Sequence, residues 1–129
     1  MSNLTDIATR PLLDLWGDTV KARRIEGERI TFAVVELAAD AVVPGHQHEN
    51  EQLGMVITGS VTFTIGDETR ELGPGGTWRI PSNVPHNVTT GPDGAVVIDI
   101  FAPTRRDWDA LPSHEGVPPI WPGADRRYP

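Results

Sequence analysis

Glycine and proline interrupt the sequence at short intervals along its whole length. The chain has 13 glycines and 12 prolines among 129 residues. Between them lie short runs rich in β-branched and aromatic residues, which is typical of strands joined by turns. The expected strands are residues 29–37, 52–58, 60–66, 68–72, 77–81, 86–90 and 95–102. This pattern predicts an all-β protein, either a sandwich or a barrel.

The two ends of the chain offer less regular structure. Short helical turns are expected around Leu12–Trp16 and Arg106–Leu111. Residues 1–24 are expected to form an N-terminal arm, and the proline-rich residues 104–129 an irregular tail. A chain of this length is expected to fold as one domain.

Composition argues against several classes of protein. The formal net charge of −7 argues against a nucleic-acid partner or an anionic membrane surface. The chain has no cysteine, so it has neither disulfides nor thiolate metal ligands. No apolar run is long enough to span a membrane, and the N-terminus lacks the apolar segment of a secretory signal. A cytoplasmic location is therefore expected.

Two of the four histidines stand one residue apart, in the stretch GHQHENEQLG at residues 45–54. Residues two apart in an extended chain point to the same face. Pro44 favours extended backbone, so His46 and His48 should face one way. Two adjacent imidazoles are unfavourable to bury without a partner, and a metal ion is the usual one.

Further ligands should come from two other places. Gln52 begins a predicted strand four residues after His48 and can supply an amide oxygen. Glu51 beside it is the alternative, in which the strand face would shift by one residue. The spacing to Gly59 favours Gln52. His86 follows a loop stiffened by prolines, in IPSNVPHN at residues 80–87, and can complete the ligand set.

The chain resembles the cupins, whose two motifs read G-x5-H-x-H-x(3,4)-E-x6-G and G-x5-P-x-G-x2-H-x3-N. The residues that fall in register with these motifs are His46, His48, Gln52, Gly59, Gly75, Pro81 and His86. The departures are Asp40 for Gly, Gln52 for Glu, Asn83 for Gly and Thr90 for Asn. The resemblance covers about residues 25–103. It implies a cupin double-stranded β-helix, a small jelly-roll barrel with the metal inside, and a homodimer.

Three neutral imidazoles and a neutral amide would leave a bound ion its full positive charge. Such an ion acts as a Lewis acid that polarises a carbonyl or hydroxyl group of a small-molecule substrate. The residues do not specify the metal, because imidazole suits zinc, nickel, copper and iron while an amide oxygen tolerates manganese or iron. A divalent metal cofactor is therefore expected, with zinc, nickel, manganese and iron as the candidates.

A second group of candidate residues lies at the end of the last predicted strand, in VVIDIFAPTRRDW at residues 96–108. Asp99 in an apolar strand is unfavourable unless it is paired or functional. Facing a cavity, it can act as acid or base beside the metal, and Arg105 can hold a carboxylate bidentately. On spacing alone, a salt bridge between Asp99 and an arginine that closes the barrel end is an equal alternative.

The run D-x-F-x-P-x-R, made of Asp99, Phe101, Pro103 and Arg105, is similar to the end of small pectin-degradation cupins of the KdgF type, as are HENEQ and IPSNVPH. In that family the enzyme opens 4,5-unsaturated uronates to linear keto acids. The resemblance implies that Asp99 is the catalytic acid and base. It also implies that Phe101 packs against the substrate ring and that Arg105 clamps its carboxylate.

Other functions stay open at this point. The aromatic, proline-rich tail suggests an aromatic polyketide cyclase, which would use a metal-assisted aldol closure in an apolar cavity. Candidate cavity residues, also compatible with plain core, are Met55, Ile57, Phe63, Trp78 and Phe101. Of these, Met55 and Trp78 are predicted with Phe101 as substrate contacts. His114 either folds back as a further ligand or lies on the surface. A non-catalytic sugar- or metal-binding cupin and an iron-dependent dioxygenase are the remaining alternatives.

Overall fold

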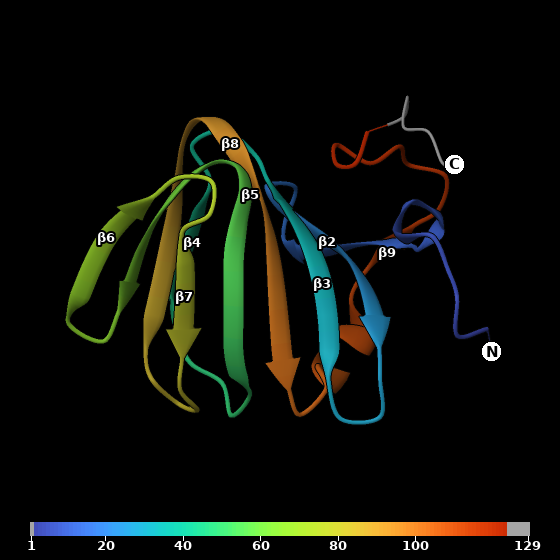
Figure 1. Ribbon diagram of the computed structural model, residues 1–129, viewed down its shortest axis with the longest axis horizontal. Helices are drawn as coiled ribbons and strands as arrows, with labels where there is room; N and C mark the ends of the chain where they lie inside the picture. The colour runs from blue at the N-terminus through green and yellow to red at the C-terminus, as the bar shows by residue number, and fades with distance from the viewer. Residues whose placement is uncertain (1, 124–129) are drawn as a thin grey trace.

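A computed structural model of the chain describes residues 2–123, and its regular structure is almost entirely β-strand (Figure 1). The strands within these residues are β1 (Leu12–Trp16), β2 (Val20–Glu26), β3 (Thr31–Leu37), β4 (Val42–His46), β5 (Glu51–Ile65), β6 (Glu68–Leu72), β7 (Thr77–Ile80), β8 (His86–Ala102) and β9 (Ser113–His114). Two 3-10 turns, η1 (Ile7–Thr9) and η2 (Arg106–Ala110), complete the structure. The predicted all-β fold is confirmed.

Two long antiparallel strands, β5 and β8, hold the fold together because each takes part in both layers. The first part of β8 pairs with β4 and with the second part of β5. The second part of β8 pairs with β3 and with the first part of β5. In Figure 1 the β8 ribbon arches over the top of the molecule from one layer to the other. The two layers thereby face each other below the arch (Figure 1).

The bend in the two long strands depends on glycine. Gly59 in β5 has φ +79° and Gly94 in β8 has φ +66°, both in the region that other residues rarely adopt. A Cβ atom on Gly59 would collide with the carbonyl oxygen of Gly94. The pairing of β5 with β8 shifts register at Gly59. The segments predicted as separate strands, 52–58 with 60–66 and 86–90 with 95–102, are therefore single bent strands.

The predicted helical turn near the N-terminus is wrong. Leu12–Trp16 forms strand β1, and it pairs with β2 through Leu13 opposite Ala22. Much of the segment predicted as an N-terminal arm, residues 1–24, therefore lies in strands β1 and β2, and both paired side chains are buried. Strand β4 was also not expected from the sequence. The predicted turn around residues 106–111 is confirmed as η2.

The C-terminal tail is tied to the outside of the sheet up to the last described residues. Strand β9 pairs with β1. Arg23, only 3% exposed, forms an ion pair with Glu36 at 3.2 Å and donates from Nη2 to the Val117 carbonyl. The Ile120 amide donates to the Glu36 carboxylate at 2.9 Å. The tail therefore covers a charged pair that a bare sheet face would leave in water.

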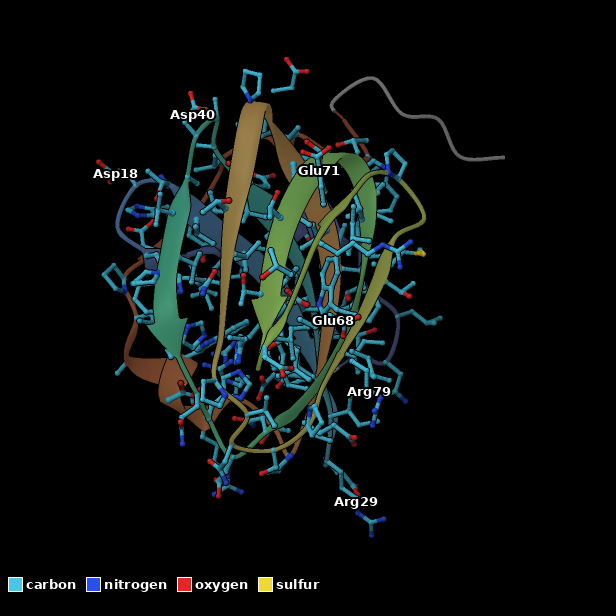
Figure 2. The ribbon with its side chains drawn as sticks, turned by 90° about the vertical axis from the view of Figure 1, so that its left-hand side faces the viewer. Asp18, Arg29, Asp40, Glu68, Glu71 and Arg79 are labelled. Carbon is cyan, nitrogen blue, oxygen red and sulfur yellow. The ribbon has the colours of Figure 1, made fainter. Side chains whose placement is uncertain are left out.

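Buried apolar side chains form the hydrophobic core, among them Val35, Val56, Val61 and Ile80. Charged residues such as Asp18, Asp40 and Arg29 are exposed and spread around the outside (Figure 2). Within residues 2–123, no helix has the length and apolar character needed to cross a membrane.

Candidate metal centre and active site

Three of the four histidines lie together and line one cavity. His46 ends β4 and His86 begins β8, where the two residues are paired in register. His48 follows in the connection to β5. The ring centroids of His46 and His86 lie 4.3 Å apart, and those of His48 and His86 lie 4.9 Å apart. One nitrogen from each ring lies within 4.8 Å of the others, a group that could hold a metal ion.

All three rings are fixed in the same way. Each Nδ1 lies 2.9 Å from a backbone carbonyl, that of Pro44 for His46, Asn50 for His48 and Val84 for His86. A carbonyl only accepts hydrogen bonds, so each Nδ1 must carry the proton and each Nε2 of a neutral ring must hold a lone pair. The buried Nε2 atom of His86 has no hydrogen-bond partner among the described residues. These are the features expected of ligands oriented for a cation.

Gln52 completes the site through both ends of its amide. Its Nε2 donates to Asp99 Oδ1 at 2.8 Å, which leaves its Oε1 3.1 Å from His48 Nε2. With the His48 proton on Nδ1, these two atoms are both acceptors and repel each other unless a cation lies between them. Two ligands about 2.1 Å from one ion and at right angles would stand about 3 Å apart. The donor set therefore fits a divalent metal ion.

The electrostatics of the histidines favour the neutral form that a metal ligand requires. Burial lowers the pKa of His86 to about 4. Burial also lowers the pKa of His48, and the positive charge of Arg105 lowers it further. Both rings are therefore neutral near pH 7, with an electron pair free for a metal.

Asp99 lies next to the ligands on the second part of β8 and is 7% exposed. Its Oδ1 accepts two hydrogen bonds of 2.8 Å, from Gln52 Nε2 and from the indole nitrogen of Trp78. Its Oδ2 receives no hydrogen bond from the described residues. Burial raises the pKa of Asp99 to about 6, against the opposing effect of these two donors. A side chain on Gly54 would collide with both the indole and the carboxylate, so β5 needs glycine there.

Arg105 lies at the edge of the same cavity, with its side chain 12% exposed. Its guanidinium carbon lies 4.7 Å from the centre of the Phe101 ring and 4.8 Å from that of Trp108. Its Nε and Nη2 donate to the two carboxylate oxygens of Asp107 at 3.1 and 2.9 Å. Two aromatic rings and one carboxylate thus fix the position and orientation of the guanidinium.

The cavity that joins these groups has a volume of about 220 Å³. One part of its wall is polar and carries the candidate functional groups: His46, His48, Gln52, His86, Asp99, Arg105 and Asp107. The rest of the wall is mainly apolar and includes Leu15, Val35, Phe63, Val97 and Phe101. The cavity therefore combines a polar reaction site with walls suited to a small ring.

The structure places most of the predicted site residues on this one cavity, but not all of them. Met55 is 38% exposed on the outer face of β5, because Gln52, Gly54 and Val56 take the inward positions of that strand. Met55, predicted as a substrate contact, therefore does not line this cavity. Trp78 is buried and does not line the cavity, and its indole nitrogen donates to the Asp99 carboxylate.

Two further expectations from the sequence are settled by the geometry. Within residues 2–123, Asp99 makes no salt bridge that closes the barrel end, and its hydrogen-bond partners there are Gln52 and Trp78. His114 lies on the surface, away from the other histidines, and its Nε2 donates to Asp14 Oδ2 at 2.8 Å. It is therefore not part of the metal centre.

Three residues of the site were not predicted. Trp16, at the end of β1, lines the cavity, and the centroids of the Trp16 and His46 rings lie 5.3 Å apart. Trp108 packs edge-on against Phe101 at 5.2 Å, and Asp107 binds Arg105. The strand-like alternation of LLDLW could have placed Trp16 on a sheet. Nothing in the sequence indicates that η2 would turn Asp107 and Trp108 back toward the cavity.

Comparison with known proteins agrees with this geometry. Residues 33–101, more than half of the chain, match a family of cupin domains. The chain belongs to the cupin family. It is 31% identical over 94 residues to the pectin degradation protein KdgF of Dickeya dadantii, covering 71% of this chain and 86% of that protein. The predicted resemblance to KdgF-type cupins is thereby confirmed.

Solved structures show the same relationship. The structure of KdgF from Halomonas sp. superimposes with a TM-score of 0.69 at 26% identity, covering 74% of this cupin and 88% of that chain. An RmlC-like cupin from Shewanella frigidimarina has a TM-score of 0.76 at 20% identity, covering 83% and 96% of the two chains, and shows the shared fold.

A shorter match is found with the H2HPP isomerase of Bacillus subtilis, 38% identical over 60 residues. The match spans 45% of this chain and 25% of that protein.

Proposed function

We propose that this cupin is a metal-dependent enzyme that opens the ring of an unsaturated uronate or a closely related cyclic acid. One observation carries the proposal. A single small cavity brings together a cluster of three imidazoles, a buried carboxylate and an arginine. These are the groups needed to polarise an oxygen, to move a proton and to hold an acid group.

The metal would be held by His46, His48, His86 and the Oε1 atom of Gln52. When bound there, a divalent cation supplies a Lewis acid for a carbonyl or hydroxyl oxygen of the substrate. Gln52 also orients Asp99, because the amide that points its oxygen at His48 donates its hydrogen to the carboxylate. Zinc, nickel, manganese and iron all suit this ligand set.

Asp99 is placed to hold and release a proton next to the metal centre. Oδ1 is occupied by the hydrogen bonds from Gln52 and Trp78, so Oδ2 is the atom available to the substrate. A general acid or base works best when its pKa lies near the working pH. The pKa of about 6 for Asp99 meets this condition near neutrality.

Arg105 and Phe101 would bind and orient the substrate. Phe101 is 3% exposed and presents its ring to the cavity, where it lies 5.9 Å from the His48 ring. Arginine binds a carboxylate with two parallel hydrogen bonds, which fixes orientation as well as position. A ring lying on Phe101 with its acid group on Arg105 would therefore face the metal centre and Asp99.

The likeness to the Dickeya pectin degradation protein and to the Halomonas KdgF structure supports this choice of substrate. The polyketide cyclase suggested by the aromatic tail finds less support. A cavity of about 220 Å³ has room for a small ring rather than a long poly-ketone chain. Of the five residues named for such a cavity, Met55 faces outward and Trp78 lies beneath Asp99.

The experiment is a turnover assay with a 4,5-unsaturated galacturonate, followed by NMR, on metal-loaded protein. We expect turnover by the wild type, its loss after chelation and its return on adding the metal. Asp99→Asn should reduce kcat by about 10²- to 10⁴-fold, the usual contribution of a general acid or base. Arg105→Ala should mainly raise KM, because it removes substrate binding.

A matched control is Met55→Ala, since Met55 lies on the outer face of the same strand as Gln52. Its activity should equal that of the wild type. Absence of turnover by the metal-loaded wild type, or full activity of Arg105→Ala, would contradict the proposal.

A further inference from the structure

The guanidinium of Arg105 already has an anionic partner. Nε and Nη2 donate to Asp107 Oδ1 and Oδ2 at 3.1 and 2.9 Å. This is the bidentate geometry with which arginine binds a carboxylate. A substrate carboxylate that approaches Arg105 therefore meets a site where a carboxylate of the chain is bound.

Asp107 is attached loosely enough to be displaced. It lies in the short turn η2, two residues after Arg105, and its side chain is 64% exposed. Its carboxylate accepts two hydrogen bonds from Arg105, and the other hydrogen bond to it comes from its own backbone N–H, within the described part of the chain. The Arg105 hydrogen bonds hold the pKa of Asp107 below its ordinary value, so it carries a full negative charge at neutral pH.

The guanidinium itself is much less free to move than Asp107. It lies over the rings of Phe101 and Trp108, at 4.7 and 4.8 Å from their centres, and both rings are buried. When an anion arrives, the aspartate is therefore the partner that gives way. If the anion binds on the remaining edge instead, two negative charges share one positive charge and repel each other.

We propose that Asp107 is a specificity-determining residue, an internal competitor that a ligand carboxylate must displace from Arg105. This inference rests on the proposed function, in which Arg105 receives the substrate carboxylate. Because Asp107 is tethered beside its partner, it is present at a high effective concentration. A simple anion that makes only the Arg105 contact competes poorly with it.

A ligand with a second attachment point is in a different position. Arg105 and the metal centre line the same cavity, so one small molecule can contact both. Contacts at the metal centre then compensate for the displacement of Asp107. The pair of Arg105 and Asp107 would thus select acids that carry an oxygen group at the right distance from the carboxylate, against isolated anions.

The test compares galacturonate with the neutral sugar galactose, using calorimetric binding to the metal-loaded wild type and to Asp107→Asn. Asparagine keeps the shape of the side chain and removes its charge. We expect Asp107→Asn to bind galacturonate about two- to fivefold more tightly, the range of an exposed ion pair. Galactose binding should not change.

Asp109→Asn is the matched control. Asp109 lies in the same turn with 65% of its side chain exposed, but its partner is Arg24, at 2.7 Å. This variant should bind galacturonate as the wild type does. If Asp109→Asn gained as much galacturonate affinity as Asp107→Asn, the effect would come from the net charge of the protein alone, and the inference would be overturned.

The inference is also overturned if Asp107→Asn binds galacturonate no better than the wild type, including the case in which neither binds. Weaker binding would mean that Asp107 positions Arg105 instead of competing for it. These outcomes are independent of turnover. Failure of the proposed function appears separately, as absence of reaction with the unsaturated substrate in the wild type.

Discussion

The buried carboxylate of Asp99 should make the metal-free protein less stable as the pH rises. Burial raises its pKa from an ordinary value of 3.8 to about 6, so the folded chain binds this proton more tightly than the unfolded chain does. Below about pH 4 the group is neutral in both states and has no effect. As the pH rises through the interval to about 6, the unfolded chain gains stability relative to the folded one.

The magnitude follows from the size of this change. One pKa unit corresponds to about 1.4 kcal/mol, so a rise of about 2 lowers the free energy of unfolding by about 3 kcal/mol. Asp99→Asn removes the effect because asparagine is neutral at every pH. Its carbonyl oxygen can still accept the hydrogen bonds from Gln52 and Trp78.

The assay is urea unfolding of chelator-treated protein, followed by tryptophan fluorescence from about pH 3.5 to 7.5. We expect the stability of Asp99→Asn relative to the wild type to increase by about 3 kcal/mol between pH 4 and pH 6, and to level off above that. Asp67→Asn, at an exposed turn position, controls for the loss of one negative charge. A difference that does not vary with pH would refute the reasoning.

Two further predictions concern packing and assembly. Gly54→Ala places a methyl group against Trp78 and Asp99; thermal unfolding should show a loss of about 1–3 kcal/mol, typical of overpacking, whereas Gly73→Ala, with open space around it, should unfold as the wild type does. The homodimer implied by the cupin resemblance remains a prediction, and we expect its contact at the exposed apolar side chains of the outer sheet face, such as Phe32 and Leu53. Light scattering should then give a dimer for the wild type and a monomer for Leu53→Glu, and a monomeric wild type would contradict it.

The candidate metal ligands could be found from the sequence because their signal is local. His46 and His48 are one residue apart, Gln52 follows at a fixed spacing, and His86 comes just after a rigid proline loop. Pairing of His46 with His86 in the sheet then brings the distant parts together. The inward position of Gln52 also fixes which residues of β5 face outward, so the exposure of Met55 followed from the same alternation.

Other features depend on contacts that no local pattern records. Strand β2 reads VKARRIE, in which a buried arginine is not expected. Arg23 can be buried because it pairs with Glu36 and donates to the Val117 carbonyl of the tail, two contacts that come from distant parts of the chain. The continuity of β5 and β8 depends on two glycines meeting where the strands bend, whereas the sequence there reads as turns. The contact between Arg105 and Asp107 depends on the orientation of both side chains around η2, which the sequence does not specify.

The central claim is that three imidazoles and one carboxamide hold a divalent ion inside the barrel, and calorimetric titration of chelator-treated protein with zinc or manganese tests it most directly. The account predicts one ion per wild-type chain and at least a tenfold loss of affinity in His86→Ala. His114→Ala, which alters the surface histidine paired with Asp14, should bind as the wild type does. No binding by the wild type, or equal affinity in His86→Ala, would contradict the account.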